Sequence, residues 1–199
     1  MQRLIFYFVI LQLSPGTTLS QVKNGWKSVE KIVKEIKHPV FINTKYDIIE
    51  FGAVGDQKTN CLPALRQAIE KCNRGGGQVI VPPGNFYIRG PIHLKSNVNV
   101  VISNGATIKF STDAEDYLPV VLTRSEGTEC FNYSPLIYAY GLSNIVITWE
   151  GTIDGSGKAG LANWKKFQSE DQTLIRKMGG NGVPINERIF GKGHYLRPV

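Results

Sequence analysis

The segment 111–135 holds the most crowded group of side chains that could do chemistry. It contains five carboxylates, one guanidinium group and three polar aromatic or amide side chains: Asp113, Glu115, Asp116, Glu126, Glu129, Arg124, Tyr117, Asn132 and Tyr133. Arginine can hold a carboxylate through two hydrogen bonds, and aromatic rings are common in the walls of ligand pockets. This combination favours a wall that contacts an acidic sugar. A solvated polar loop would have the same composition, so both interpretations stay open.

Three cysteines, Cys61, Cys72 and Cys130, could in principle form a metal site or a disulfide. Their spacing matches no zinc pattern, and no metal ligand or cofactor is assigned. Three cysteines cannot all pair within one chain. Two alternatives therefore remain, one disulfide with a free thiol or three buried thiols. Cys72 follows an apolar helical face, which favours a place in the core.

The amino terminus has the features of a secretory signal peptide. Arg3 precedes an apolar run over 4–13 (LIFYFVILQL), and a Ser-Pro-Gly break and small residues lead to a cleavage site near Ser20. A membrane anchor is the alternative, but a span needs about 20 apolar residues. Residues 1–20 are therefore predicted to be a signal peptide, and the protein to be secreted and extracellular. The glycosylation sequon at 132–134 (NYS) is followed by Pro135, which argues against its use.

Residues 21–45 are predicted to form an amphipathic helix over 21–37 and a linker. The proline after His38 ends the helix because it disfavours helical geometry in the preceding residue. The apolar residues recur at helical spacing, and we expect the helix to pack on the outside of a domain. The apolar face consists of Trp26, Val29, Ile32, Val33 and Ile36.

The remaining residues, 46–199, begin with a strand at 48–54, a turn at 55–57 and a helix that starts at Asn60 or Cys61. Three glycines at 75–77 stop this helix. Short β-branched runs separated by Gly, Pro and Asn turns follow. They lie at 78–81, 86–88, 92–94, 98–102, 106–110, 136–139, 145–149 and 151–153. This spacing predicts an all-β chain coiled as a parallel β solenoid, with the helix covering the open end of the first rung.

Two sequence units occur twice, which supports the solenoid. Residues 96–102 (SNVNVVI) are echoed by 143–147 (SNIVI), and 105–108 (GATI) by 151–153 (GTI). The offset of 46 to 47 residues exceeds one rung because the loop 111–135 is inserted. Long loops in compact domains tend to be functional.

The tail from Lys158 carries eight Lys or Arg against three Asp or Glu, in a chain of net charge +7. A basic surface favours an acidic partner. A secreted protein rarely meets nucleic acid, so an anionic polysaccharide fits better, although a solvated surface would have the same charge. One or two helical turns are expected within 161–178 and a loop at 179–182. The chain is expected to end at 194–199 without helix, strand or polar cap.

Several motifs in a fixed order resemble one known family, the polygalacturonases and their pectin-degrading relatives. These motifs cover about three quarters of the chain. They are 51–56 (FGAVGD), 75–77 (GGG), 81–84 (VPPG), 90–98 (GPIHLKSNV), 116–120 (DYLPV), 126–127 (EG), 133–137 (YSPLI), 151–155 (GTIDG), 188–191 (RIFG) and 194–198 (HYLRP). The resemblance implies a right-handed parallel β-helix and a secreted glycoside hydrolase that cleaves α-1,4 galacturonosyl bonds of pectin with inversion.

The family's catalytic motifs are not found in this chain. The resemblance implies aspartates in an Asn-Thr-Asp segment and an Asp-Asp pair, followed by Gly-His-Gly and Arg-x-Lys. Here Thr44 is followed by Lys45, and His194 by Tyr195, while the sequence has no Asp-Asp pair and no Arg-x-Lys. Residues 46–199 are therefore expected to be the amino-terminal part of the β-helix, truncated before the catalytic rungs.

No other carboxylate is a convincing replacement. Asp56 and Asp154 lie in turns, where aspartate has a structural role. Nothing in the sequence fixes Glu126 and Glu129 at the separation of about 6.5–9.5 Å that an inverting pair needs. No catalytic, substrate-binding or metal-binding residue is assigned. The function expected by resemblance is a polygalacturonase-type hydrolase, inactive as this chain alone and monomeric, with pectin as its partner. The alternative is a non-catalytic secreted β-helix protein that binds acidic polysaccharide.

Overall fold

The computed structural model describes residues 25–159 and 161–197. The predicted signal peptide at 1–20 lies outside the described residues. The chain divides between His38 and Pro39 into two units, and each is described by itself. None of the described helices has both the length and the apolar character that crossing a membrane requires.

The first unit contains helix α1, Gly25–Glu35. A further backbone hydrogen bond runs from the Ile36 amide to the Ile32 carbonyl. The helix predicted at 21–37 is confirmed over these residues, and residues 21–24 lie outside the described part. Its packing on a domain stays a prediction.

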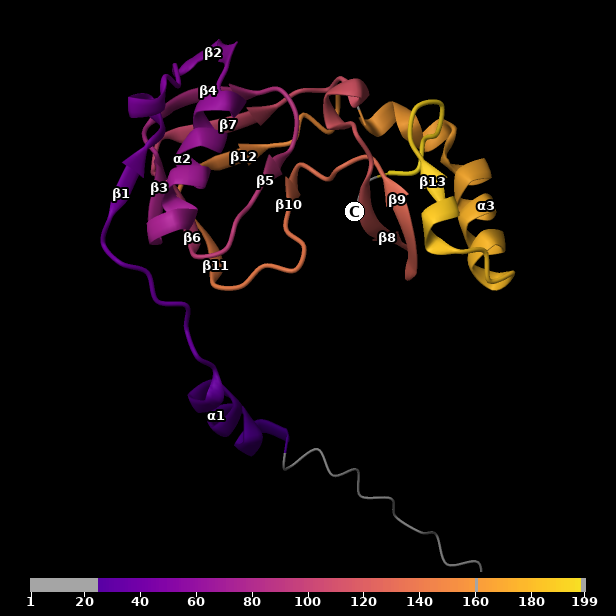
Figure 1. Cartoon of the computed structure of the whole chain (residues 1–199), viewed down its shortest axis with the longest axis horizontal. Coiled ribbons are helices and arrows are strands. Elements are labelled where there is room, and N and C mark those ends of the chain that lie inside the picture. The colour runs from indigo at the N-terminus through magenta and orange to yellow at the C-terminus, as the bar shows by residue number, and fades with distance from the viewer. Residues whose placement is uncertain (1–24, 160, 198–199) are drawn as a thin grey trace, which may run out of the picture. The chain divides into compact units, whose positions relative to one another are not determined.

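The second unit is built on three parallel sheets (Figure 1). The first sheet has the order β1-β3-β6-β11, with the bounds Lys45–Asp47, Gly77–Val81, Val98–Ile102 and Ile145–Trp149. The second has the order β12-β7-β4-β2, with the bounds Thr152–Asp154, Ala106–Phe110, Gly84–Ile88 and Asp56–Asn60. The third pairs β10, Ile137–Tyr138, with β5, Ile92–His93.

The chain visits these sheets in the same order on each turn, which is the connectivity of a coil. Gly77 pairs with Val98, which is 21 residues later. Val98 in turn pairs with Ile145, which is 47 residues later, because a long insertion separates β7 from β10. The predicted repeat of 96–102 at 143–147 is therefore confirmed as a pairing of neighbouring rungs.

Inward side chains of successive rungs stack on one another and form the main core. Strands β3, β6 and β7 alternate buried and half-buried residues along their length. Phe86 pairs with Ile108, and Ile108 pairs with Ile153 on the next rung. Because side chains alternate across a strand, this register places one apolar ladder inside the coil, while the outward positions hold polar residues together with Ile80 and Val101.

The predicted strand at 48–54 is wrong. Residues Ile48–Phe51 form a 3₁₀ helix, η2, because the Asp47 carboxylate accepts a hydrogen bond from the Ile49 amide at its start. Gly52 ends the turn with φ of 92°. The predicted turn at 55–57 is present at Gln57, which has φ of 64°, although Asp56 and Gln57 are also the first residues of β2, an irregular strand whose five side chains are all exposed. An exposed strand has no alternating apolar pattern by which it could be recognised.

Helix α2, Leu62–Gly75, is confirmed, and its apolar face is buried in the main core. The Asn60 side-chain oxygen accepts hydrogen bonds from the Leu62 and Arg89 amides, which fixes the helix start to the turn after β4. The helix contacts β1, β3, β5 and β6. It therefore covers strands of the first rungs, as its predicted capping position requires.

The insertion and the tail contain more structure than was predicted. Within 111–135 there are a 3₁₀ helix, η3 (Ala114–Tyr117), and an antiparallel hairpin of β8 (Val121–Ser125) and β9 (Thr128–Asn132). Glu126 and Gly127 make the turn with positive φ, the geometry that two-residue hairpin loops favour. The expectation of an irregular loop is therefore wrong.

The tail is helical where little helix was expected. It contains η4 (Leu161–Lys166), α3 (Gln168–Gly180), η5 (Ile185–Glu187) and β13 (Ile189–Phe190). The loop predicted at 179–182 begins two residues too early, and β13 pairs in parallel with β9. The parallel sheets agree with the predicted parallel β-helix and α2 is its predicted capping helix, whereas the helix α3 was not part of the predicted all-β class.

A small second core explains why the helices and strand of the tail were not predicted from the sequence. Cys130, Ile175, Phe190 and Leu196 are buried together. They come from β9, α3, β13 and the segment after it, and each element contributes one residue. No periodic apolar pattern can arise from such single contributions, so only the tertiary contacts reveal this core.

All three cysteines are free and buried, so the alternative of three buried thiols is confirmed. Burial raises the pKa of the Cys72 thiol to about 11, and burial is also the first cause of the raised pKa of Cys61 and of Cys130. The thiols are therefore protonated at neutral pH and have the character of small core residues.

The stacked core predicts a large difference between neighbouring residues of β4. Phe86 is 1% exposed, whereas Asn85 beside it is exposed. We expect Phe86→Ala to lower the free energy of unfolding by about 3–5 kcal/mol, because it removes contacts and leaves a cavity. Asn85→Ala should change it by less than about 0.5 kcal/mol. Guanidinium unfolding of both variants measures the two effects, and equal losses would contradict the stacked-rung interpretation.

Candidate functional site

A large cavity lies where the insertion, the last rung and the tail meet. We call it the aromatic pocket; its volume is about 680 Å³. It is lined by Ala114, Tyr117, Tyr133, Ser134, Pro135, Leu136, Gly155, Gly157, Trp164, Lys165, Gln168 and Arg197. Pockets of a few hundred cubic ångströms with apolar walls and a few polar groups are typical of small-ligand sites.

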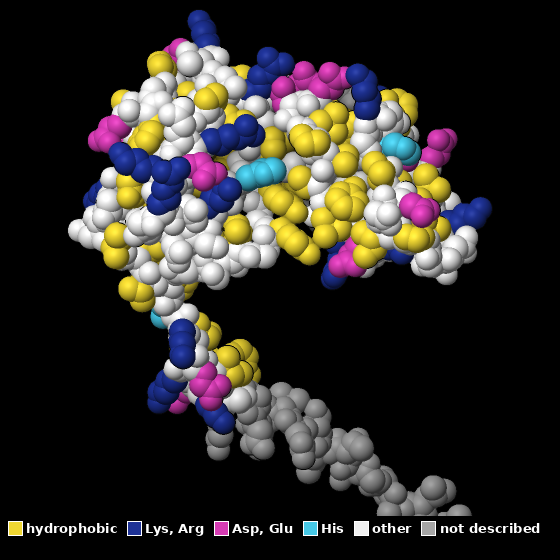
Figure 2. Space-filling view, viewed as in Figure 1, with side chains coloured by type: hydrophobic (Ala, Val, Ile, Leu, Met, Phe, Trp, Pro, Cys, Tyr) yellow, Lys and Arg dark blue, Asp and Glu magenta, His cyan; other side chains and the backbone are white. Residues whose placement is uncertain are grey.

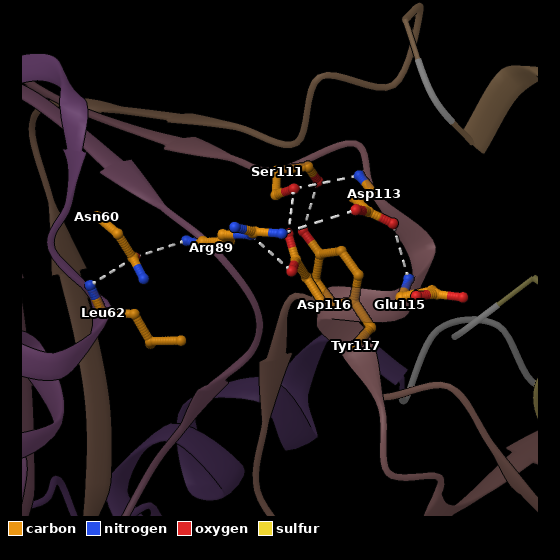
Figure 3. Close-up of polar contacts among 8 residues, drawn as sticks. All are labelled: Asn60, Leu62, Arg89, Ser111, Asp113, Glu115, Asp116 and Tyr117. Carbon is orange, nitrogen blue, oxygen red and sulfur yellow. Dashed lines mark hydrogen bonds and ion pairs between the residues drawn. The ribbon is translucent and has the colours of Figure 1, made fainter.

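Arg89 holds η3 in place from the turn between β4 and β5 (Figure 3). Its Nε atom lies 2.8 Å from one carboxylate oxygen of Asp116 and 3.0 Å from the other. The Asp116 side chain is 12% exposed and also accepts a hydrogen bond from the Ser111 hydroxyl at 2.6 Å. Gly90 gives room for this contact, because a Cβ there would lie 2.8 Å from the Asp116 carbonyl oxygen.

Two further hydrogen bonds connect η3 to the wall of the aromatic pocket. The Tyr117 hydroxyl donates to the Ser111 carbonyl at 2.6 Å (Figure 3), and the Ser134 amide donates to the Tyr117 carbonyl at 3.0 Å. The wall formed by Tyr117, Tyr133 and Ser134 is therefore tied to the rungs by a continuous chain of hydrogen bonds.

The opposite wall comes from the tail and is fastened by buried polar groups. Asn132, which is fully buried, donates to the Leu196 carbonyl at 3.0 Å. The Asp171 carboxylate on α3 accepts from the Tyr195 amide and lies 2.7 Å from Nδ1 of His194. These contacts fix the backbone next to Arg197, which lines the pocket.

The pocket presents cations and aromatic rings but no carboxylate. Lys165 and Arg197 form no ion pair with any other described side chain. The rings of Tyr133 and Trp164 meet edge to face with centroids 5.1 Å apart. No Asp or Glu is among the described residues of the lining. The arrangement suits binding of an acidic ligand with apolar ring faces.

The tyrosine hydroxyls of the pocket are hydrogen-bond donors rather than bases. Burial is the main cause of the raised pKa of Tyr117, with the charge of Asp116 as a further cause. The pKa of Tyr133 is also raised, first by burial and then by the charge of Glu115. Both hydroxyls therefore stay protonated at neutral pH.

A second, more open hollow lies beside the pocket, over β10 and the hairpin. Figure 2 shows hydrophobic side chains gathered in the middle of this face. The hollow has a volume of about 360 Å³, and Leu122, Ile137, Tyr138 and Tyr140 line it together with Arg124 and Glu129. Arg124 is not free to bind a carboxylate ligand, because it pairs with Glu129 across the hairpin at 3.3 Å.

The residues singled out in 111–135 fall into two groups, those that line the aromatic pocket and those that stabilise the fold. Tyr117 and Tyr133 do line a pocket, whereas Asp113, Glu115 and Asp116 are structural. Glu115 pairs with Lys192 at 2.7 Å, which is the main cause of its lowered pKa. Glu126 pairs with Arg176 on α3. The predicted wall is therefore aromatic, and its charges come from elsewhere.

The two turn aspartates have the structural role that the sequence suggested. Asp56 accepts hydrogen bonds from the Thr59 amide at 2.7 Å and the Lys58 amide at 2.8 Å. These bonds lower its pKa from 3.8 to about 2. Asp154 accepts from the Ser156 amide at 2.8 Å. The sequon at Asn132 is buried, so its side chain is inaccessible to glycosylation in the folded chain.

Sequence reasoning missed the half of the pocket that the tail provides. Trp164, Lys165, Gln168 and Arg197 were given no role, although the excess of basic residues after Lys158 was a usable signal. The missing information was the fold of the tail, in which β13 and α3 contact β9.

Comparisons with known proteins give a consistent result. Residues 45–179 match the family model described as rhamnogalacturonase A/epimerase, pectate lyase-like. The chain is 44% identical to a hyperthermoactive exopolygalacturonase from Thermotoga maritima, with a TM-score of 0.81 over 87% of this chain. A family 28 exopolygalacturonase from Yersinia enterocolitica is 30% identical over 57% of the chain, with a TM-score of 0.51.

A curated relative, a probable polygalacturonase from Vitis vinifera, is 30% identical over 60% of this chain. The matched residues are only 26% of that relative, 41% of the Thermotoga chain and 21% of the Yersinia chain. This chain thus spans less than half the length of each of these proteins.

The Arg89–Asp116 contact predicts a local effect on order. Arg89→Ala should speed hydrogen exchange of the amides in 114–118 by about fivefold, because a charge-assisted contact with one exposed partner is worth about 1 kcal/mol. Exchange in β6 and β7 should not change. Arg124→Ala is the matched control, since it breaks an exposed ion pair of the same insertion. Unchanged exchange at 114–118 would mean that Arg89 does not hold η3.

The lowered pKa of Asp56 predicts acid sensitivity with a defined sign. A carboxyl group with a depressed pKa in the folded state stabilises the fold above its unfolded pKa of 3.8, and this contribution is lost as the pH falls towards about 2. We expect the melting temperature of the wild type to fall more steeply between pH 4 and pH 2 than that of Asp56→Asn. Parallel curves from fluorescence-detected melting would contradict this.

Proposed function

Because this chain belongs to the rhamnogalacturonase A/epimerase, pectate lyase-like family, we propose that it is a polygalacturonase-like hydrolase that acts on the α-1,4 galacturonosyl bonds of pectin. The observation that carries the proposal is the 44% identity to the Thermotoga exopolygalacturonase over 87% of this chain. Other pectin-degrading relatives support the same substrate class.

In this proposal, the 199 residues form the amino-terminal rungs of a right-handed β-helix, and the catalytic aspartates belong to rungs that this sequence does not contain. Two observations support this. The matched residues are 41% of the Thermotoga chain. Strands β10, β11 and β12 lie at the edges of their sheets and have a described partner on one side only.

The aromatic pocket is the proposed contact with the substrate. A polygalacturonate chain carries a carboxylate on each ring and apolar C–H faces between its hydroxyl groups. Lys165 and Arg197 can pair with a carboxylate, while Trp164 and Tyr133 can cover a ring face. We also propose that the protein is secreted, because residues 1–20 have the features of a signal peptide and pectin lies outside the cell. A monomeric state stays a prediction.

A non-catalytic protein that binds acidic polysaccharide is the second candidate. It is favoured by the use of the described carboxylates, because Asp56 and Asp154 hold turns and Glu126 and Glu129 form ion pairs. No carboxylate lines the described pocket. Both candidates require binding of polygalacturonate, and only the first requires hydrolysis.

The test separates the candidates by measuring binding and hydrolysis on two forms of the protein. The 199-residue chain should bind polygalacturonate without releasing reducing ends. The protein isolated from its source should have a mass above 22.1 kDa and should release galacturonic acid. A native mass at or below 22.1 kDa with binding alone would support the second candidate. Absence of binding by both forms would contradict both.

Charge substitutions test whether the aromatic pocket is the binding site. We expect Lys165→Gln combined with Arg197→Gln to weaken polygalacturonate binding about tenfold and to reduce its salt dependence, because each exposed contact to a carboxylate is worth about 0.5–1 kcal/mol. Lys45→Gln combined with Lys58→Gln is the charge-matched control, since both lysines are exposed and lie outside the pocket. Equal weakening by both pairs would show attraction by net charge rather than a site.

A further inference from the structure

Four aromatic rings form a continuous row that leads out of the aromatic pocket. Tyr133 contacts Trp164, Trp164 contacts Tyr195, and Tyr195 contacts Phe167. The centroid distances are 5.1, 5.9 and 4.8 Å in that order. We call this set the aromatic row.

Exposure rises along the row from its inner to its outer end. Tyr133 is 4% exposed, Tyr195 is 38% exposed and Phe167 is 54% exposed. The outer rings are therefore accessible to a ligand, while the inner ring is part of the pocket wall. A large exposed aromatic surface that continues from a pocket is a feature of interaction sites.

Phe167 does not stabilise the start of α3, the helix that it precedes. It occupies the position before α3 where Ser, Thr, Asp or Asn would cap the first turn, and it makes no capping hydrogen bond. An exposed phenylalanine there gives up that hydrogen bond and leaves apolar area in water. Contact with a ligand would give this side chain a use that the folded chain alone does not.

The outer rings are held in a fixed arrangement, which lowers the entropy cost of binding. The Asp171 carboxylate, 8% exposed in the first turn of α3, accepts from the Tyr195 amide and lies 2.7 Å from the His194 ring. Tyr195 is thus fixed to the start of the helix that follows Phe167. Tyr195 and Phe167 meet with an interplanar angle of 35°.

The charge next to the outer rings is mixed, with one unpaired cation. A further cavity of about 160 Å³ is lined by Phe167, Tyr195 and Lys166, and also by the carboxylates Glu170 and Asp171, of which Asp171 is engaged with His194 and the Tyr195 amide. Lys166 forms no ion pair with another described side chain. The outer end of the row therefore has two exposed rings and one unpaired cation, Lys166, whereas the aromatic pocket has two cations, Lys165 and Arg197.

We propose that Tyr195 and Phe167, which continue the row beyond Trp164, form an outer subsite on which further sugar rings of an acidic polysaccharide stack when its first rings occupy the aromatic pocket. Packing the C–H face of a pyranose ring on an aromatic ring removes apolar area of both from water. The subsite rests on the proposed function, since it adds length selectivity to the same binding site. A ligand too short to leave the pocket gains nothing from it.

The test compares a short and a long ligand on the 199-residue chain by isothermal titration calorimetry, with digalacturonate and hexagalacturonate as the probes. The wild type should bind the hexamer more tightly than the dimer. Phe167→Ala should weaken hexamer binding about fivefold and should leave dimer binding within about twofold, because Phe167 lies beyond the pocket. Trp164→Ala should weaken binding of both ligands.

Leu174→Ala is the matched control, because Leu174 is a 40% exposed apolar residue on α3 that belongs to neither cavity. It should change neither affinity, and equal melting temperatures exclude unfolding as the cause. Unchanged hexamer binding in Phe167→Ala, or equal affinity of the wild type for both ligands, would overturn the outer subsite and leave the proposed function standing. Failure of the wild type to bind either ligand would overturn both.

Discussion

The register of the parallel rungs is the constraint on which the rest of this structure depends. Each rung buries its inward side chains only if the same position of the next rung is also apolar, as in the ladder from Phe86 through Ile108 to Ile153. A shift of one residue would turn every inward side chain outward. The stacked core therefore fixes the direction of each strand, the length of each rung and the places where insertions can leave the coil.

The insertion and the tail depend on that scaffold through polar contacts rather than through a large core of their own. Arg89 in a turn of the coil binds Asp116, and the buried Asn132 side chain binds the Leu196 carbonyl. The second core adds only a few apolar residues. A region held in this way should open more readily than the rungs, and regions of lower local stability are where binding sites are often found.

The chemistry of the pocket depends on which charged groups are already paired within the fold. The carboxylates of the insertion are engaged in hydrogen bonds and ion pairs within the fold, as Asp116 is with Ser111. Lys165 and Arg197 are therefore the unpaired charges beside the aromatic rings of the pocket. Such a site has the charges and ring faces that suit an acidic sugar chain, and its described lining contains no carboxylate. The proposed function accordingly places only binding in this pocket.

The sequence by itself determined the parallel coil, helix α2 and the family, because each depends on local or repeating patterns. Short β-branched runs between turns predicted the stacked strands, and the repeat of 96–102 at 143–147 supported a solenoid, in which the structure pairs Val98 with Ile145. It also pointed to Tyr117 and Tyr133 as a wall. Only the tertiary structure decided η2, the hairpin, the tail and the other half of the pocket. Asn132 meets Leu196 across 64 residues, and no local pattern encodes a contact at that distance in the chain.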